Sequence, residues 1–112
     1  MNRDKVTLLQ IADAAQLIVA FSQDFEIGQF AEHLLTRSAV LYQFAVLGEA
    51  VKRLSEEFRE NHPSIPWNEI AGMRDRVVHG YDSVNFDRVW DAIVNDIPDL
   101  LIYLQPHLPR QE

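Results

Sequence analysis

Hydrophobic residues recur every three or four positions along nearly the whole chain, and no segment alternates between apolar and polar residues like a β-strand. This spacing places apolar side chains on one face of an α-helix. The pattern predicts helices over residues 4–21, 27–35, 37–60, 67–79 and 86–104. Because the connections between them are short, we expect an all-α fold. It would be an up-and-down bundle of four main helices plus one short helix, the second.

The predicted helix 37–60 carries more apolar surface than one packing seam requires. Spacings of four and three, like those of a coiled coil, join six of its residues: Val40, Phe44, Leu47, Val51, Leu54 and Phe58. Leu41, Ala45 and Gly48 form a second stripe beside them, and its small residues would let another backbone come close. The helix is therefore either an ordinary core helix or one that also carries a subunit contact.

Proline, glycine and asparagine mark the predicted helix ends. Two prolines in the loop 61–66 stop one helix and prepare the next. Gly80 is placed to end the helix 67–79 in the left-handed conformation, and Asn85 is placed to cap the last helix. Pro98 lies inside that last helix and has no backbone N–H, so we expect a kink or one open turn there.

The composition indicates one domain spanning residues 1–112. Hydrophobic residues make up 47% of the chain, and the low content of glycine (four) and proline (five) argues against disorder. We expect no membrane span, because no apolar stretch approaches the ~20 residues that a span needs. The N-terminus lacks the apolar core of a secretory signal. The absence of cysteine excludes disulfides and thiolate metal sites, and a cytoplasmic location fits it.

The net charge of −7 argues against a protein that coats nucleic acid through a broad basic face. A small local basic site remains compatible with that total. Seven cations are candidates for it: Arg37, Lys52, Arg53, Arg59, Arg74, Arg76 and Arg88. Taken singly, each of them is better explained as solvated surface charge.

The candidate chemistry lies at the end of the predicted helix 67–79, where Arg74 precedes His79 by five residues. Arginine makes forked contacts with phosphate oxygens, and histidine is the side chain best suited to moving a proton near neutral pH. Together they could cleave a phosphodiester without a metal. Five helical steps separate the two side chains by roughly 140°, so they do not form a tight pair on one face.

Two further residues are candidates for supporting His79. Asp75 is four residues before it on the same helix face and could fix its tautomer and stabilise its charged form. Arg76 is three residues before it and could oppose that charge. We expect a protonatable, partly exposed His79 at a helix C-terminus. The alternative interpretation is a simple helix cap among solvated charges.

The other histidines do not predict a metal site. His33, His62 and His107 are far apart in the sequence and show no ligand spacing, so we expect neither a metal nor another cofactor. Trp67 and Trp90 are better explained as core anchors than as platforms for stacked bases.

The segment Arg74-x4-His79-x-Tyr81 resembles the Arg-x4-His-x-Tyr motif of the HepT family, a branch of the HEPN ribonucleases. Further stretches resemble that family in order along nearly the whole chain: residues 48–54, 65–75, 89–90 and 96–98. The resemblance implies a HEPN-like helical fold and a homodimer whose two motif segments form one composite, metal-independent endoribonuclease site.

Specific roles also follow from this resemblance. Arg74 would hold the scissile phosphate, and His79 would act as general acid or base while a ribose 2′-hydroxyl attacks phosphorus. The family consists of toxins encoded beside an MntA-type nucleotidyltransferase antitoxin, which adds AMP to the motif tyrosine, here Tyr81. Added negative charge and bulk two residues from His79 would repel RNA.

Two other functions remain open from the sequence. One is a non-catalytic helical subunit that binds a nucleotidyltransferase and its nucleotide or substrate. The other is a plain structural dimer, for which alanine at Arg74 or His79 would change nothing except stability.

Overall fold

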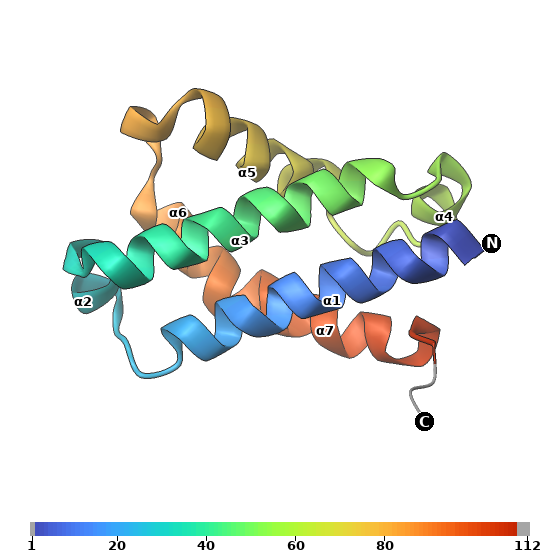
Figure 1. Ribbon diagram of the computed structural model, residues 1–112, viewed down its shortest axis with the longest axis horizontal. Coiled ribbons are helices and arrows are strands. Elements are labelled where there is room, and N and C mark those ends of the chain that lie inside the picture. Colours follow the sequence, from blue (N-terminus) through green and yellow to red (C-terminus); the bar gives the residue numbers. More distant parts are fainter. Residues whose placement is uncertain (1, 110–112) are drawn as a thin grey trace.

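The computed structural model describes residues 2–109, though not the side chains of Asn2 and Tyr81, and every regular element in that range is helical (Figure 1). The α-helices are α1 (Asn2–Ser22), α2 (Ile27–Glu32), α3 (Leu34–Arg53), α4 (Glu56–Asn61), α5 (Trp67–His79), α6 (Phe86–Asp91) and α7 (Ile97–Leu104). Short 3-10 turns lie at Tyr81–Ser83 and Gln105–His107, and a π-helical turn lies at Ala92–Asp96. The predicted all-α fold is confirmed.

Helix α3 is the centre of the bundle. It packs along α1 on one side and against α5 on another, while α7 packs against the other side of α1 (Figure 1). The side chains between these helices are fully buried and apolar, among them Ile11, Ile18, Leu41, Leu47 and Leu100. Leu41 and Gly48 of the predicted second stripe are buried within one chain, whereas Ala45 is only half-buried.

The expectation of one continuous helix over 37–60 is wrong, because α3 ends at Arg53 and α4 begins at Glu56. Ser55 lies in the break, where its Oγ accepts a hydrogen bond from the backbone N–H of Phe58 at 3.0 Å. The carboxylate of Asp4 accepts bonds from the Ser55 N–H at 3.0 Å and hydroxyl at 2.7 Å. Burial raises the pKa of Asp4, but these bonds outweigh it and lower the pKa overall.

The predicted helix 27–35 is likewise shorter than expected. It ends at Glu32, and His33 caps α3 by accepting a hydrogen bond at Nδ1 from the N–H of Thr36 at 3.2 Å.

Of the two helix caps predicted in the second half of the chain, one is confirmed and one is wrong. Asn85 caps α6 as predicted, with its Oδ1 accepting from two backbone N–H groups. Gly80 does not adopt the predicted left-handed conformation, since its φ is −141°.

Pro98 has the predicted local effect. The turn Ala92–Asp96 just before it is wound as a π-helix, and the N–H of Ile97 bonds to the carbonyl of Ala92, five residues back. A proline supplies no N–H to the ladder, and the wider turn accommodates that missing donor.

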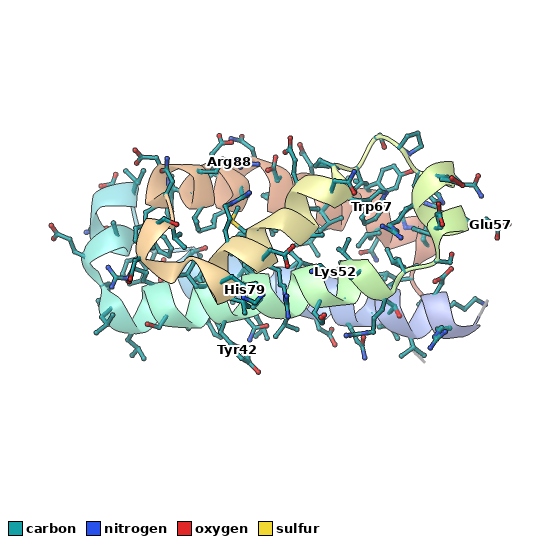
Figure 2. The ribbon with its side chains drawn as sticks, turned by 90° about the horizontal axis from the view of Figure 1, so that it is seen from above. Tyr42, Lys52, Glu57, Trp67, His79 and Arg88 are labelled. Carbon is teal, nitrogen blue, oxygen red and sulfur yellow. The ribbon has the colours of Figure 1, made fainter. Side chains whose placement is uncertain are left out.

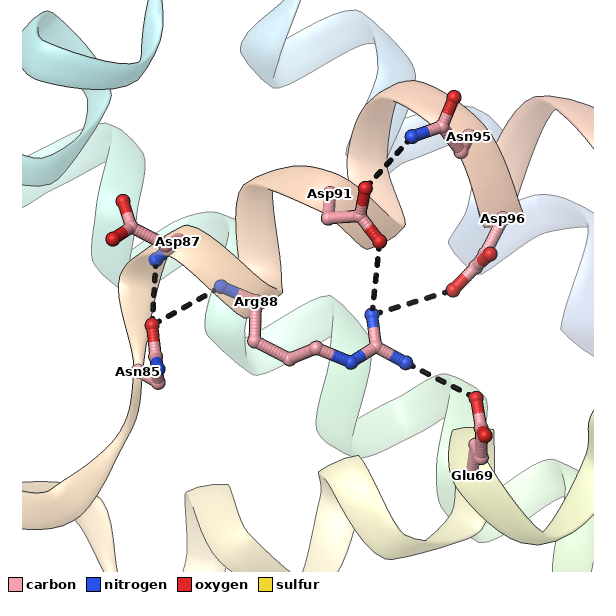
Figure 3. A network of polar contacts seen from close by, with 7 residues as sticks. All are labelled: Glu69, Asn85, Asp87, Arg88, Asp91, Asn95 and Asp96. Atoms are coloured by element: carbon pink, nitrogen blue, oxygen red, sulfur yellow. Dashed lines mark hydrogen bonds and ion pairs between the residues drawn. The ribbon is translucent and has the colours of Figure 1, made fainter.

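Arg88 ties this C-terminal segment to α5 (Figure 3). Its Nη2 lies 3.1 Å from the Glu69 carboxylate on α5. Its Nη1 lies 3.6 Å from Asp91 and 3.4 Å from Asp96. One planar guanidinium therefore fixes the start of α5 against the α6–α7 segment.

Helix α1 is long and apolar enough to cross a membrane by length and composition alone, contrary to the expectation from the sequence. One face of α1 points into the bundle, where Leu8, Ile11, Ala15 and Ile18 are buried, while Val6 and Leu17 are exposed. The core accounts for the apolar character of that inner face.

Candidate functional site

The candidate site begins at a close crossing of α3 and α5, at Gly48. A Cβ atom on Gly48 would lie 2.3 Å from the Cβ of Arg74 and 3.2 Å from the carbonyl oxygen of Ile70. No real side chain fits at such distances, so the backbone of α5 rests directly on Gly48. The predicted close approach at this small residue is confirmed, and it fixes the point from which the Arg74 side chain extends.

The Arg74 guanidinium is held by one carboxylate from each helix. Its Nη1 lies 3.1 Å from Oδ1 of Asp75 on α5, and its Nη2 lies 3.7 Å from Oε1 of Glu49 on α3. The side chain is 24% exposed. It is therefore oriented by the protein while part of it stays accessible to a ligand.

Lys52 joins the same group from α3. Its Nζ lies 2.6 Å from Oδ1 of Asp75, the oxygen that Arg74 also contacts. The hydrogen bond from Lys52 and then that from Arg74 lower the pKa of Asp75, so this carboxylate is charged at neutral pH. Figure 2 shows Lys52 and His79 on the two helices near their crossing.

The predicted pair of Asp75 with His79 does not form. The Asp75 carboxylate is engaged with Lys52 and Arg74, and the His79 imidazole makes no hydrogen bond or ion pair with the side chains that the structure describes. His79 is exposed and is the last residue of α5, as expected. The two cations attract Asp75 more strongly than a neighbouring imidazole can, and this explains the failure of the spacing argument.

Arg76 is exposed, and its guanidinium lies toward Gly72, one turn back along α5: a Cβ on Gly72 would be 3.5 Å from Nη1. Arg74 and His79 do not contact each other either, in agreement with their predicted angular separation. A single chain thus presents the arginine and the histidine as separate groups.

A shallow depression opens beside Arg74 between α3 and α5. Its volume is about 350 Å³, and its lining residues are Ala45, Val46, Glu49, Arg53, Arg74 and Val78. Large apolar side chains are exposed on the same two helices: Val78, which lines the depression, is 48% exposed, and Leu35 and Tyr42 on α3 are 76% and 66% exposed. An apolar rim next to charged groups is typical of a surface that binds a partner.

Comparison with known proteins shows the family of this chain. A family model described as "Ribonuclease HepT-like" matches residues 11–106. The chain belongs to the HepT-like ribonuclease family. The predicted resemblance and the assignment to the ribonucleases are therefore confirmed.

Relatives of this HepT-like chain carry matching names. It is 37% identical over 93 residues to "Probable ribonuclease HepT" of Thermococcus cleftensis, which covers 83% of this chain and 84% of the relative. It is 34% identical over 92 residues to a "Putative RNase" of Methanocaldococcus jannaschii, with 82% and 76% covered. A "Putative RNase" of Caldanaerobacter subterraneus subsp. tengcongensis is 34% identical over 100 residues, with 89% of both chains covered. No solved structure matches this chain.

The third residue of the HepT-like motif, Tyr81, begins the 3-10 turn Tyr81–Ser83 directly after Gly80. Its side chain lies outside the described residues, so its role as an AMP acceptor stays a prediction. The N–H of Gly80 donates to the carbonyl of Arg76, and the N–H of Ser83 donates to the carbonyl of Gly80, both at 2.8 Å. The turn therefore continues α5 closely and keeps Tyr81 near His79 along the backbone.

The fold of this HepT-like chain also brings together histidines that the sequence keeps apart. The rings of His62 and His107 lie 4.7 Å apart, and His62 Nδ1 lies 2.6 Å from the Tyr103 hydroxyl. Burial and then the nearby His107 lower the pKa of His62. Within residues 2–109, no three His, Asp or Glu side chains are grouped as a metal site.

Proposed function

We propose that this chain is a metal-independent endoribonuclease toxin of a HepT/MntA-type pair, acting in the cytoplasm. The observation that carries the proposal is the oriented, partly exposed guanidinium of Arg74 at the α3–α5 crossing, five residues before the exposed His79. Arg74 and His79 are the proposed catalytic residues. Arginine offers a rigid fork of donors to phosphate, and histidine exchanges protons near neutral pH.

The proposed reaction is an intramolecular attack within the RNA. The ribose 2′-hydroxyl attacks phosphorus, a base removes its proton, and the departing 5′-oxygen takes up a proton from an acid. The products are a 2′,3′-cyclic phosphate and a 5′-hydroxyl. Arg74 would stabilise the charge that develops on the phosphate oxygens, while His79 acts as acid or base.

We propose that the working unit is a homodimer. Val78 lines the Arg74 depression, and Leu35 and Tyr42 lie further toward the start of α3; all three apolar side chains are exposed in one chain. A second copy of the chain would cover this surface. It would also bring its own His79 toward the Arg74 of the first copy. Because Arg74 and His79 of one chain do not contact each other, a site formed by two chains could bring an arginine and a histidine together. A composite site supplies one histidine as base and one as acid.

The test of the reaction is RNA cleavage by purified, unmodified protein in the presence of EDTA. We expect cleavage at the same rate with and without EDTA, with products that end in a cyclic phosphate. The Arg74→Ala variant, with an unchanged melting temperature, is expected to lose about 10²–10³-fold in rate, the usual effect of removing one preorganised donor.

Absence of cleavage by the wild type, with an intact dimer and unmodified Tyr81 confirmed by mass, would contradict the proposal. It would favour the second candidate, a non-catalytic subunit that binds a nucleotidyltransferase and its nucleotide or substrate. One observation supports that candidate: the Glu49 and Asp75 carboxylates both contact Arg74 and offset its charge and that of Lys52. Such a balanced site attracts phosphate less than a basic one.

Regulation by AMP is proposed at Tyr81. Coexpression with an MntA-type nucleotidyltransferase is expected to add the mass of one or more AMP units to the wild type and none to Tyr81→Phe. The modified protein should cleave RNA more slowly, because new phosphate charge beside His79 repels the substrate. If the wild type stays unmodified in that coexpression although the transferase is active, regulation of this chain by AMP addition is excluded. The Tyr42→Phe variant is the matched control for a general effect of removing a tyrosine hydroxyl.

A further inference from the structure

Two cations from different helices meet at a single carboxylate oxygen. Lys52 Nζ on α3 and Arg74 Nη1 on α5 lie 2.6 and 3.1 Å from Oδ1 of Asp75. A phosphate oxygen is an anionic acceptor of similar size and accepts the same kinds of donor. The position of this carboxylate oxygen is therefore a place where one phosphate oxygen could contact both cations at once.

We propose that Lys52 is a second RNA-binding residue of the site, which holds the same phosphate as Arg74. The inference rests on the proposed ribonuclease function and adds a substrate contact to it. In the RNA-free protein, the Asp75 carboxylate occupies the position of a phosphate oxygen. RNA binding exchanges that internal contact for contacts between the phosphate and the two cations.

The neighbouring cations are placed differently from Lys52. Arg53 Nη2 donates to Oε1 of Gln10 on α1 at 2.8 Å, and the Arg76 guanidinium lies toward Gly72. Lys52 shares a partner with Arg74, and that shared partner places its charge beside the guanidinium. Two cations therefore lie together in this acidic chain, offset by the Asp75 and Glu49 carboxylates, and the small size of the group fits a grip on one phosphate.

Lys52 is also free to change partner while the fold stays intact. The side chains of Lys52 and Asp75 are 38% and 49% exposed, and an exposed ion pair adds little to stability because water screens it. Removal of the Lys52 charge should therefore act on RNA binding and leave folding unchanged. This difference separates a substrate contact from a structural one.

The test measures binding of a labelled single-stranded RNA to the His79→Ala protein, which cannot consume the probe, over a range of salt concentrations. We expect Lys52→Gln in that background to bind about tenfold more weakly at low salt, the effect of removing one charge-assisted hydrogen bond. The plot of log affinity against log salt should also become shallower, by up to about 0.7, because Arg74 alone neutralises the shared phosphate less completely. Lys52→Arg should restore most of the affinity, and all variants should melt at the same temperature.

Lys5→Gln is the matched control, because Lys5 is exposed on α1 and its substitution removes the same charge. It should leave both the affinity and the salt slope near those of the parent. A Lys52→Gln protein with the affinity and slope of its parent, while the parent binds RNA, overturns this inference and leaves the proposed function standing. If the parent binds no RNA and the wild type cleaves none, both are overturned.

Discussion

Replacing His79 with alanine is expected to lower the rate of RNA cleavage by about 10²–10⁴-fold, the usual contribution of a general acid or base. The side chain is exposed at the last residue of α5 and makes no hydrogen bond or ion pair in the described part of the chain. Its truncation should therefore leave the fold and the dimer unchanged. The measurement is the cleavage rate at saturating RNA, beside the melting temperature and the molecular mass in solution.

His33→Ser is the matched control for this experiment. His33 is also exposed, and its imidazole caps α3 through the N–H of Thr36. A serine hydroxyl can accept the same hydrogen bond, so the control removes an imidazole while it preserves the cap. Equal reductions of rate in both variants would point to a general effect of surface histidines and contradict a catalytic role of His79.

Substitution of Gly48 with alanine is expected to disturb both the fold and the site. The added Cβ would stand 2.3 Å from the Cβ of Arg74, an atom that cannot move unless α5 moves. Overpacking of this kind costs about 1–3 kcal/mol of unfolding free energy. In a domain of this size each kcal/mol lowers the melting temperature by about 4–8 °C. A shift of Arg74 by about 1 Å would also reduce cleavage by about 10²-fold.

Gly28→Ala is the matched control, since a Cβ at Gly28 would meet no atom within 4 Å. Alanine is the better helix former, so this variant in α2 should be as stable as the wild type or slightly more stable, with full activity. A Gly48→Ala protein with unchanged melting temperature and cleavage rate would refute the argument that the glycine sets the distance between α3 and α5.

Local patterns predicted those parts of the fold that local forces decide. Helix α5 begins and ends at the predicted residues, because two prolines precede it and a glycine follows it. The division of the predicted helix 37–60 could not be seen in the same way. Its apolar seam continues through the break, and the carboxylate that stabilises Ser55 belongs to Asp4, 51 positions earlier. Such a contact exists only once α1 and α3 are packed together.

The proposed site was predictable only in part. Arg74 and His79 were proposed from residue type and spacing, and their catalytic roles stay predictions. Lys52 was one of seven candidate cations and Glu49 was not assigned to the site, because their approach to Arg74 depends on the α3–α5 crossing at Gly48. The predicted contact of Asp75 with His79 failed for the same reason: the competing cation arrives from a different helix.

Helix α1 packs against α3 and α7, so its apolar face stays exposed to solvent during synthesis until both of these helices have been made. During synthesis α1 emerges first, but α3 is complete only roughly 30 residues later and α7 later still. At about 5–20 residues per second this interval lasts seconds. Throughout it, a helix with the length and apolar character of a membrane span has no partner. A nascent chain of this protein should therefore bind chaperones that recognise apolar helices until α7 leaves the ribosome.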